Sequence, residues 1–175
     1  MKLIYTIFCY FYFIGLTLAQ NNYPVPKITN TRLFYIQHSL SKNTYVYDVN
    51  LNGNIIDVHN PIHVYRILYE DNGQVANLTM PQRKLAYGYN AERVNDKLYK
   101  FNIVAYKNQK MNLVNRNQKF VVETIVNNKP MILERMFIQI KPNSHPLKVD
   151  VDYILFTGID SKSGKKLTEK FVMPN

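Results

Sequence analysis

Residues 119–141 read KFVVETIVNNKPMILERMFIQIK, two apolar and β-branched runs on either side of a polar turn that contains a proline. Short runs of this kind, bounded by Asn, Gly and Pro, are typical of strands joined by tight connections. The same pattern recurs in segments that we expect to be strands: 32–38, 44–51, 62–69, 98–106, 119–126, 131–141, 149–159 and 166–173. These segments predict an all-β domain, a single antiparallel β-barrel or sandwich of about eight strands.

Alternation along three of these segments indicates which side chains face the core. In 98–106 the odd positions are apolar, and in 131–141 the even positions are apolar apart from Glu134. In 62–69 the row of Ile62, Val64 and Leu68 includes Arg66, and the opposite row, which contains Tyr65, is almost as apolar. We therefore expect both faces of segment 62–69 to be covered, either both by the protein or one by the protein and the other by a ligand.

One short helix interrupts this pattern at residues 80–87. Thr79 and Gln82 are spaced as in a capping box, and Pro81 is tolerated in a first helical turn. Gly88 is expected to end the helix in a left-handed conformation.

The first 19 residues form a predicted signal peptide, with Lys2 before an apolar run and Ala19 at the expected cleavage site. An uncleaved membrane anchor is the alternative, but the run is short for a span and no basic residue follows it until Lys27. Residues 20–31 are then an extended lead-in and residues 32–175 a single β domain. We expect the protein to be exported to the periplasm or the cell exterior, without stable membrane insertion after cleavage.

Composition excludes several chemistries. The chain of 175 residues has one cysteine, Cys9, inside the predicted signal peptide. The mature chain therefore has no disulfide, no thiol nucleophile and no cysteine-bound zinc. Loss of Lys2 lowers the formal net charge from +10 to +9. Such a basic domain attracts polyanions, although the basic residues are spread along the chain.

Four segments together resemble an uncharacterised family of exported proteins, mainly from Bacteroidetes-type bacteria and known as a domain of unknown function. They are Leu33–Ile36, Asn43–Asp48, Asn60–Tyr65 and Gln82–Gly88 (QRKLAYG). The resemblance covers the chain from about Leu33 to Phe171, and its most specific part is the Leu-Ala-Tyr-Gly run. It implies a bacterial envelope or secreted setting, and it carries neither an activity nor site residues.

The sequence contains no signature of catalysis. No serine or threonine stands in a glycine-flanked elbow, and the spacing of Asp150 and Asp152 is typical of a solvent-facing strand row. His59 and His63 are separated by Pro61, which prevents the helix that would bring both rings to one metal. We expect no catalytic residue, metal site, cofactor or nucleic-acid partner; the oligomeric state is left open.

Two groups of residues are candidates for ligand binding. Arg66 and Glu134 stand in apolar rows, so they either pair in one interior, line a cavity that binds a polar ligand, or belong to the outer face of an edge strand. Tyr65, in the opposite row of segment 62–69, is a further candidate. The helix contributes the second group, Gln82, Arg83, Lys84 and Tyr87, with Tyr89 just beyond it; their arginine and tyrosine side chains suit anions and glycans. Its alternative is a solvated helix surface.

These observations predict an exported, non-enzymatic binding protein. Its abundant tyrosine and phenylalanine favour an aromatic-lined pocket for a small molecule or an envelope component. An alternative is an interaction protein whose basic surface docks an acidic envelope partner such as lipopolysaccharide, a glycan or a protein. A third is an enzyme of unrecognised type, with Glu134 as its acid or base.

Overall fold

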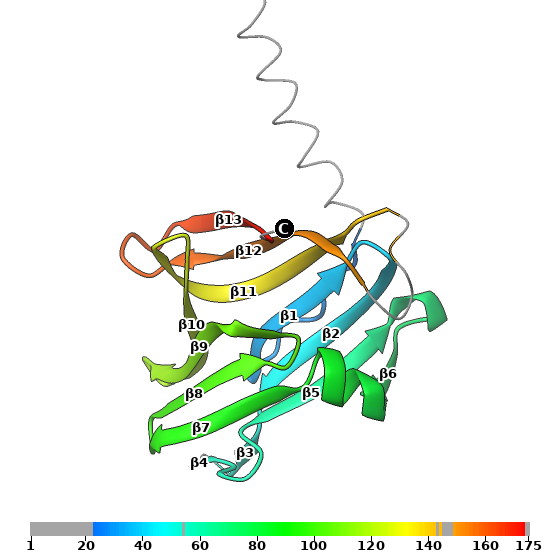
Figure 1. Cartoon of the computed structure of the whole chain (residues 1–175). Helices are drawn as coiled ribbons and strands as arrows, with labels where there is room; N and C mark the ends of the chain where they lie inside the picture. Colours follow the sequence, from blue (N-terminus) through cyan, green and yellow to red (C-terminus); the bar gives the residue numbers. More distant parts are fainter. Residues whose placement is uncertain (1–22, 54, 143, 145–148, 174–175) are drawn as a thin grey trace, which may run out of the picture.

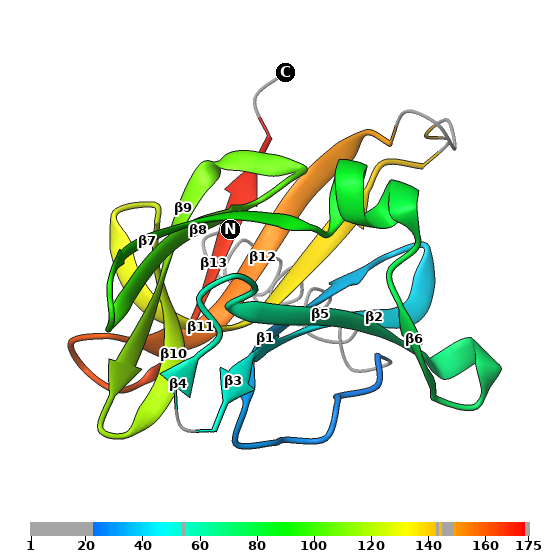
Figure 2. The ribbon, with the colours of Figure 1, turned by 90° about the horizontal axis from the view of Figure 1, so that it is seen from below.

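The computed structural model describes residues 23–53, 55–142, 144 and 149–173, and the predicted signal peptide lies outside these ranges. The described chain is mostly β-structure, in a large sheet that curls into a half-barrel (Figures 1 and 2). The strands are β1 (Arg32–His38), β2 (Ser41–Val49), β3 (Leu51–Asn52), β4 (Ile55–Ile56), β5 (Ile62–Leu68), β6 (Gln74–Asn77), β7 (Tyr89–Asn95), β8 (Leu98–Ile103), β9 (Tyr106–Arg116), β10 (Lys119–Val126), β11 (Lys129–Ile140), β12 (Val151–Asp160) and β13 (Lys166–Val172).

All eight predicted segments contain a strand, but the described chain has thirteen strands rather than about eight. The prediction missed β6, β7 and β9, besides the small pair β3–β4. β7 reads YNAERVN and is exposed along nearly its whole length, and β9 begins with the polar run YKNQK. The exposed edge strand β7 and the polar first half of β9 lack the apolar alternation by which strands are recognised, although Met111 and Leu113 farther along β9 are buried.

The sheet is mixed, which corrects the prediction of a purely antiparallel one. Its order is β6-β5-β2-β1-β11-β10-β9-β8-β7, and β12 and β13 continue from the other edge of β11. β10 pairs with the first part of β11 and β1 with residues 135–138. The β1–β11 pair is parallel, while every other pair of described strands is antiparallel.

The core fills the inner side of the curled sheet. Phe34 of β1 is fully buried and stacks on Tyr47 of β2, with ring centroids 4.4 Å apart, and on Phe101 of β8 at 6.4 Å. Tyr99, Phe101 and Ile103 are buried, which confirms the predicted core face within β8, whereas Ala105 is exposed because it lies in the turn that follows the strand. Burial of such large side chains supplies the stability of a domain without disulfides.

A β-bulge in β11 explains why the predicted core face of this strand is partly wrong. Leu133 pairs with Gly158 and Arg135 with Thr157, so Glu134 is an extra residue on one side of the ladder. Such a bulge shifts the alternation by one position. The odd-numbered residue Leu133 is therefore buried before the bulge and the even-numbered Met136 after it.

The predicted helix is a single π-helical turn, Gln82–Ala86, and the described chain contains besides it a short 3-10 turn, Tyr69–Asp71. The predicted capping box forms: the Thr79 N–H donates to Gln82 Oε1 at 3.0 Å, and the Gln82 N–H donates to Thr79 Oγ1 at 3.4 Å. Gly88 does not adopt a left-handed conformation. A Cβ atom there would lie 1.9 Å from the Arg83 carbonyl oxygen, so glycine is required for space.

The lead-in 23–31 packs on the outer side of the sheet. The Gln37 side-chain amide is buried and donates to the Pro24 carbonyl at 2.7 Å and to Thr44 Oγ1 at 2.8 Å. Tyr23 makes an edge contact with Phe137, with ring centroids 4.9 Å apart. These contacts show how both faces of β1 come to be covered.

One ion pair fastens the β10–β11 turn to β13 and predicts a pH dependence. Lys129 Nζ donates to Glu169 Oε1 at 2.6 Å, and this bond lowers the pKa of Glu169 below its ordinary value of 4.5. A depressed pKa adds stability above the unfolded-state pKa, and that stability is lost as the pH falls through the folded-state pKa. We expect Lys129→Met to lower the free energy of unfolding near neutral pH by roughly 0.5–1 kcal/mol, since Lys129 is half exposed.

Urea unfolding of the wild type and the variant, measured near neutral pH and well below pH 4.5, checks this expectation. The difference between the two proteins should vanish in acid, where Glu169 is protonated. The control is Lys165→Met, which removes an exposed lysine that makes no ion pair with the described residues. It should change stability little at either pH. A Lys129→Met effect that persists in acid would contradict the assignment to Glu169.

Candidate functional site

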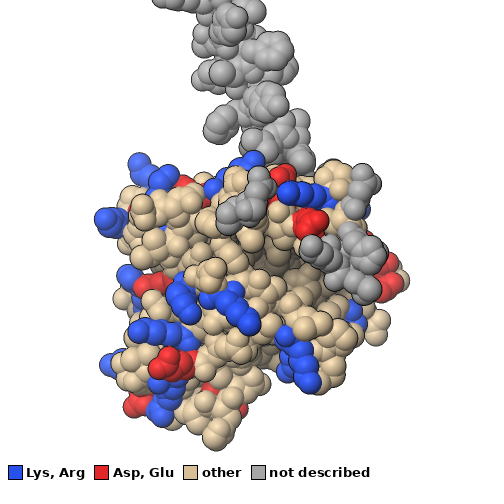
Figure 3. Space-filling view, in the orientation of Figure 1, with Lys and Arg blue, Asp and Glu red and all other residues tan. Residues whose placement is uncertain are grey.

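A cavity of about 860 Å³ opens on the inner side of the half-barrel. Its lining comes from β1, β11, β12, the β8–β9 turn and the π turn, and it is mainly aliphatic: Ile36, Leu85, Ile103, Met136, Ile138, Ile140, Val151 and Ile154. Figure 3 shows a hollow on this side of the molecule with a mostly uncharged surface and with charged side chains near its rim. The size and apolar character are those of a site for a small organic ligand.

Polar groups gather at one end of this cavity. Tyr87 stacks on Tyr45 of β2 with ring centroids 3.4 Å apart, and the His38 ring lies 6.0 Å from Tyr45 and 6.5 Å from Tyr87. The Gln82 side-chain amide donates to the Tyr45 hydroxyl at 3.4 Å. The Tyr47 hydroxyl donates to the Tyr87 carbonyl at 2.6 Å, so the core itself holds the π turn in place.

None of the four side chains of His38, Tyr45, Gln82 and Tyr87 is charged near neutral pH, although the Arg66 guanidinium acts on Tyr45 from the neighbouring strand. Burial lowers the pKa of His38 below 6.5, with Glu70 acting in the opposite direction, so the ring is neutral. Burial also raises the pKa of the hydroxyls of Tyr45 and Tyr87. A hydroxyl, carbonyl or amide of a ligand could hydrogen-bond to this end, and the charged residues of the lining, Lys141 and Asp150, are exposed.

The four candidates from the predicted helix separate in the structure. Gln82 and Tyr87 line the cavity, Arg83 lines a different cleft between β5 and β7, and Lys84 is exposed outside both. The four residues therefore do not share one surface, and Gln82, Tyr87 and Arg83 stay candidates at two separate hollows.

Arg66 and Glu134 do not meet. Arg66 of β5 lies directly opposite Tyr45, and its Nε is buried without a hydrogen-bond partner among the described residues. Glu134 occupies the bulge of β11 and contributes to the raised pKa of Tyr35, after the larger effect of burial. Tyr35 alternates along β1 with the core residues Phe34 and Ile36, so Glu134 lies by the opposite face of the sheet from Arg66.

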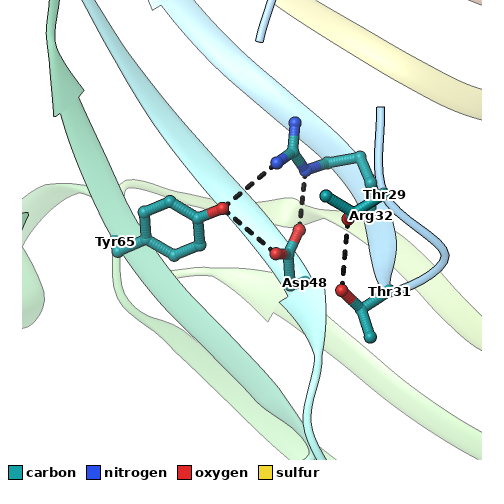
Figure 4. A network of polar contacts seen from close by, with 5 residues as sticks. All are labelled: Thr29, Thr31, Arg32, Asp48 and Tyr65. Atoms are coloured by element: carbon teal, nitrogen blue, oxygen red, sulfur yellow. Dashed lines mark hydrogen bonds and ion pairs between the residues drawn. The ribbon is translucent and has the colours of Figure 1, made fainter. Parts of the chain in front are cut away.

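Tyr65 belongs to a polar network on the outer face rather than to the cavity (Figure 4). Its hydroxyl donates to Asp48 Oδ2 at 3.1 Å and accepts from Arg32 Nη2 at 3.1 Å, and Arg32 Nε donates to Asp48 Oδ1 at 2.6 Å. The network joins β1, β2 and β5, and Thr29 and Thr31 share a hydrogen bond beside it. Its role is therefore to hold three strands together.

Sequence reasoning missed His38 and Tyr45, and it missed the aliphatic lining as a site. Both residues lie in predicted strands, but nothing in their local pattern indicates that they meet the π turn. The alternation could place Tyr45 on a face of β2; it could not place Tyr87 against that face.

Comparison with known proteins gives one family match. The family model described as Domain of unknown function (DUF4833) matches residues 34–170. No curated protein matches the chain, and no solved structure matches it. Within the described ranges, no helix is long and apolar enough to cross a membrane.

Proposed function

The chain belongs to this family, the domain of unknown function DUF4833, and we propose that it is an exported, non-enzymatic binding protein. Its inner cavity holds a small, largely apolar molecule that has one uncharged polar end. The proposal rests on one observation: an aliphatic cavity of about 860 Å³ whose lining includes the uncharged side chains of His38, Gln82 and Tyr87, with Tyr45 stacked on Tyr87.

Apolar surface that faces water in an empty cavity carries a free-energy cost of about 25 cal/mol per Å². A ligand that covers the aliphatic lining removes that cost, while the polar end fixes the orientation of the ligand. Aliphatic side chains make up more of the lining than the expected aromatic ones. Flat aromatic stacking is therefore a smaller part of the recognition than the composition indicated.

Ala105→Trp tests this proposal. Ala105 is exposed in the β8–β9 turn and lines the cavity, so a tryptophan there can occupy the ligand volume without disturbing a buried residue. With the uncharged fluorescent probe N-phenyl-1-naphthylamine, we expect the variant to lose affinity by about tenfold or more. The measurement is a fluorescence titration on residues 20–175.

The matched control is Ala91→Trp, the same change at an exposed alanine that lines the cleft between β5 and β7 instead. It should leave the affinity for the probe unchanged. Native mass spectrometry of the protein from its producing cell should show an added mass that Ala105→Trp loses and that high salt does not remove. Equal probe binding by the two variants and the wild type would contradict the cavity as the site.

A further inference from the structure

The half-barrel leaves a seam between β5 and β7. β6 pairs with residues 65–68 of β5, so residues 62–64 have no strand on that edge within the described chain. At this seam the side chain of Tyr89 makes hydrogen bonds to the segment that includes the start of β5, where a neighbouring strand would pair through its backbone. The hydroxyl of Tyr89 on β7 accepts from the Ile62 N–H at 3.2 Å and donates to Asn60 Oδ1 at 2.7 Å.

A cleft of about 470 Å³ lies along this seam, and its titratable side chains are basic except for tyrosines. The basic side chains are those of His59, His63, Arg83 and Arg93, all exposed, and no aspartate or glutamate belongs to the described lining. Asn60 and Asn90 add neutral amide groups. The cleft therefore combines positive charge with hydrogen-bonding groups suited to hydroxyls.

Two acidic residues near the cleft, Asp57 and Asp96, make contacts of their own, whereas Glu92 of β7 makes no ion pair with the described residues. Asp57 Oδ1 accepts the backbone N–H groups of His59 and Asn60 at 2.9 and 3.1 Å, and Asp96 pairs with Arg93. Arg83, in contrast, makes no ion pair with any residue in the described ranges. Burial raises the pKa of Tyr89, the Ile62 N–H bond and the Arg83 charge lower it, and the Asp57 charge raises it. The Arg83 guanidinium and the Asp57 carboxylate therefore both act on the seam.

We propose that the seam cleft binds a small acidic saccharide, with Arg83 holding its phosphate, sulfate or carboxylate group. A guanidinium offers several N–H donors in a planar fork that fits such anions. The volume exceeds that of the anion alone, and Asn60 and Asn90 lie where amides can bind sugar hydroxyls. This site is separate from the apolar cavity, because Gln82 and Arg83 of the π turn line different hollows.

Calorimetric titration with glucose 6-phosphate, glucose 6-sulfate, glucuronate, glucose and inorganic phosphate tests the proposal. We expect an acidic sugar to bind more tightly than both glucose and inorganic phosphate, and Arg83→Ala to weaken its binding about tenfold. Raising the salt concentration should also weaken binding of the acidic sugar to the wild type, because the site is exposed. The tightest of the three acidic sugars identifies the preferred anion.

Lys84→Ala is the matched control, since Lys84 is the neighbouring exposed cation and lies outside the cleft. It should bind the acidic sugar as the wild type does, whereas Ala91→Trp should block it. Arg83→Ala should retain N-phenyl-1-naphthylamine binding, which separates this site from the cavity and shows that the variant is folded. If Arg83→Ala and Lys84→Ala lowered the affinity for the acidic sugar equally, binding would be a general attraction to positive charge, and the proposed site would be overturned. If inorganic phosphate bound as tightly as glucose 6-phosphate, the proposal that the ligand is a saccharide would be overturned.

Discussion

Replacing Gly158 by alanine is expected to lower the free energy of unfolding by more than about 3 kcal/mol. Gly158 lies in β12 opposite Leu133, beside the bulge of β11. A Cβ atom there would lie 2.0 Å from the Ile132 carbonyl oxygen and 3.2 Å from the Leu133 Cα. Both are backbone atoms of the strand that holds β1, β10 and β12, so neither can move without disturbing the centre of the sheet.

Urea unfolding followed by circular dichroism measures this loss, and Gly53→Ala is its control. Gly53 has a φ of +65° and nothing within 4 Å of an added Cβ, so alanine there adds backbone strain without a clash. That strain costs about 1–2 kcal/mol. Equal losses at the two glycines would show that β11 and β12 can separate at the bulge at little cost.

Replacing Asp48 by alanine is expected to cost about 3 kcal/mol, the lower end of the range for breaking a buried ion pair. The side chains of Arg32 and Asp48 are 11% and 12% exposed. The substitution leaves the Arg32 guanidinium without its counter-charge, and it removes the acceptor of the Tyr65 hydroxyl. β1, β2 and β5 lose their common link on the outer face.

Two comparisons make the Asp48 measurement specific. Asp96→Ala breaks the exposed pair with Arg93 and should change stability by at most about 1 kcal/mol. The double substitution Arg32→Met with Asp48→Leu removes both charges and should recover part of the loss, because no uncompensated charge stays buried. If Asp48→Ala were as mild as Asp96→Ala, Arg32 would be finding water or another partner.

The local pattern predicted strands with clear apolar alternation and missed those with long polar or exposed stretches, among them β9, whose Met111 and Leu113 are buried in the core. β8 shows strict alternation and its face was confirmed, whereas the exposed β7 shows none. In β11 the sequence analysis assumed that alternation continues through Glu134. The run is apolar on both sides of this residue, so the sequence does not mark it as the extra residue of a bulge. The capping box of Thr79 and Gln82 was likewise local, and it formed although the turn that follows is of the π type.

The candidate site was predictable only in part. The π turn was identified, and with it Gln82 and Tyr87 of the cavity and Arg83 of the seam cleft. Their partners Tyr45 and Asn60 belong to distant strands and turns, and no spacing in the sequence connects them. Arg66 and Glu134 appeared equivalent as charges in apolar rows, yet the bulge places Glu134 by the opposite face of the sheet.

The sequence by itself determined an all-β chain, several of its turns and the buried face of β8, because alternation and turn chemistry depend on neighbouring residues. The tertiary structure alone decided the parallel pairing of β1 with β11, the curl into a half-barrel, and with them the cavity and the seam. β1 and β11 lie about 100 residues apart, so no turn specifies that pairing. A strand pattern records that a side chain is buried, whereas the partner that buries it is decided when distant strands pack together.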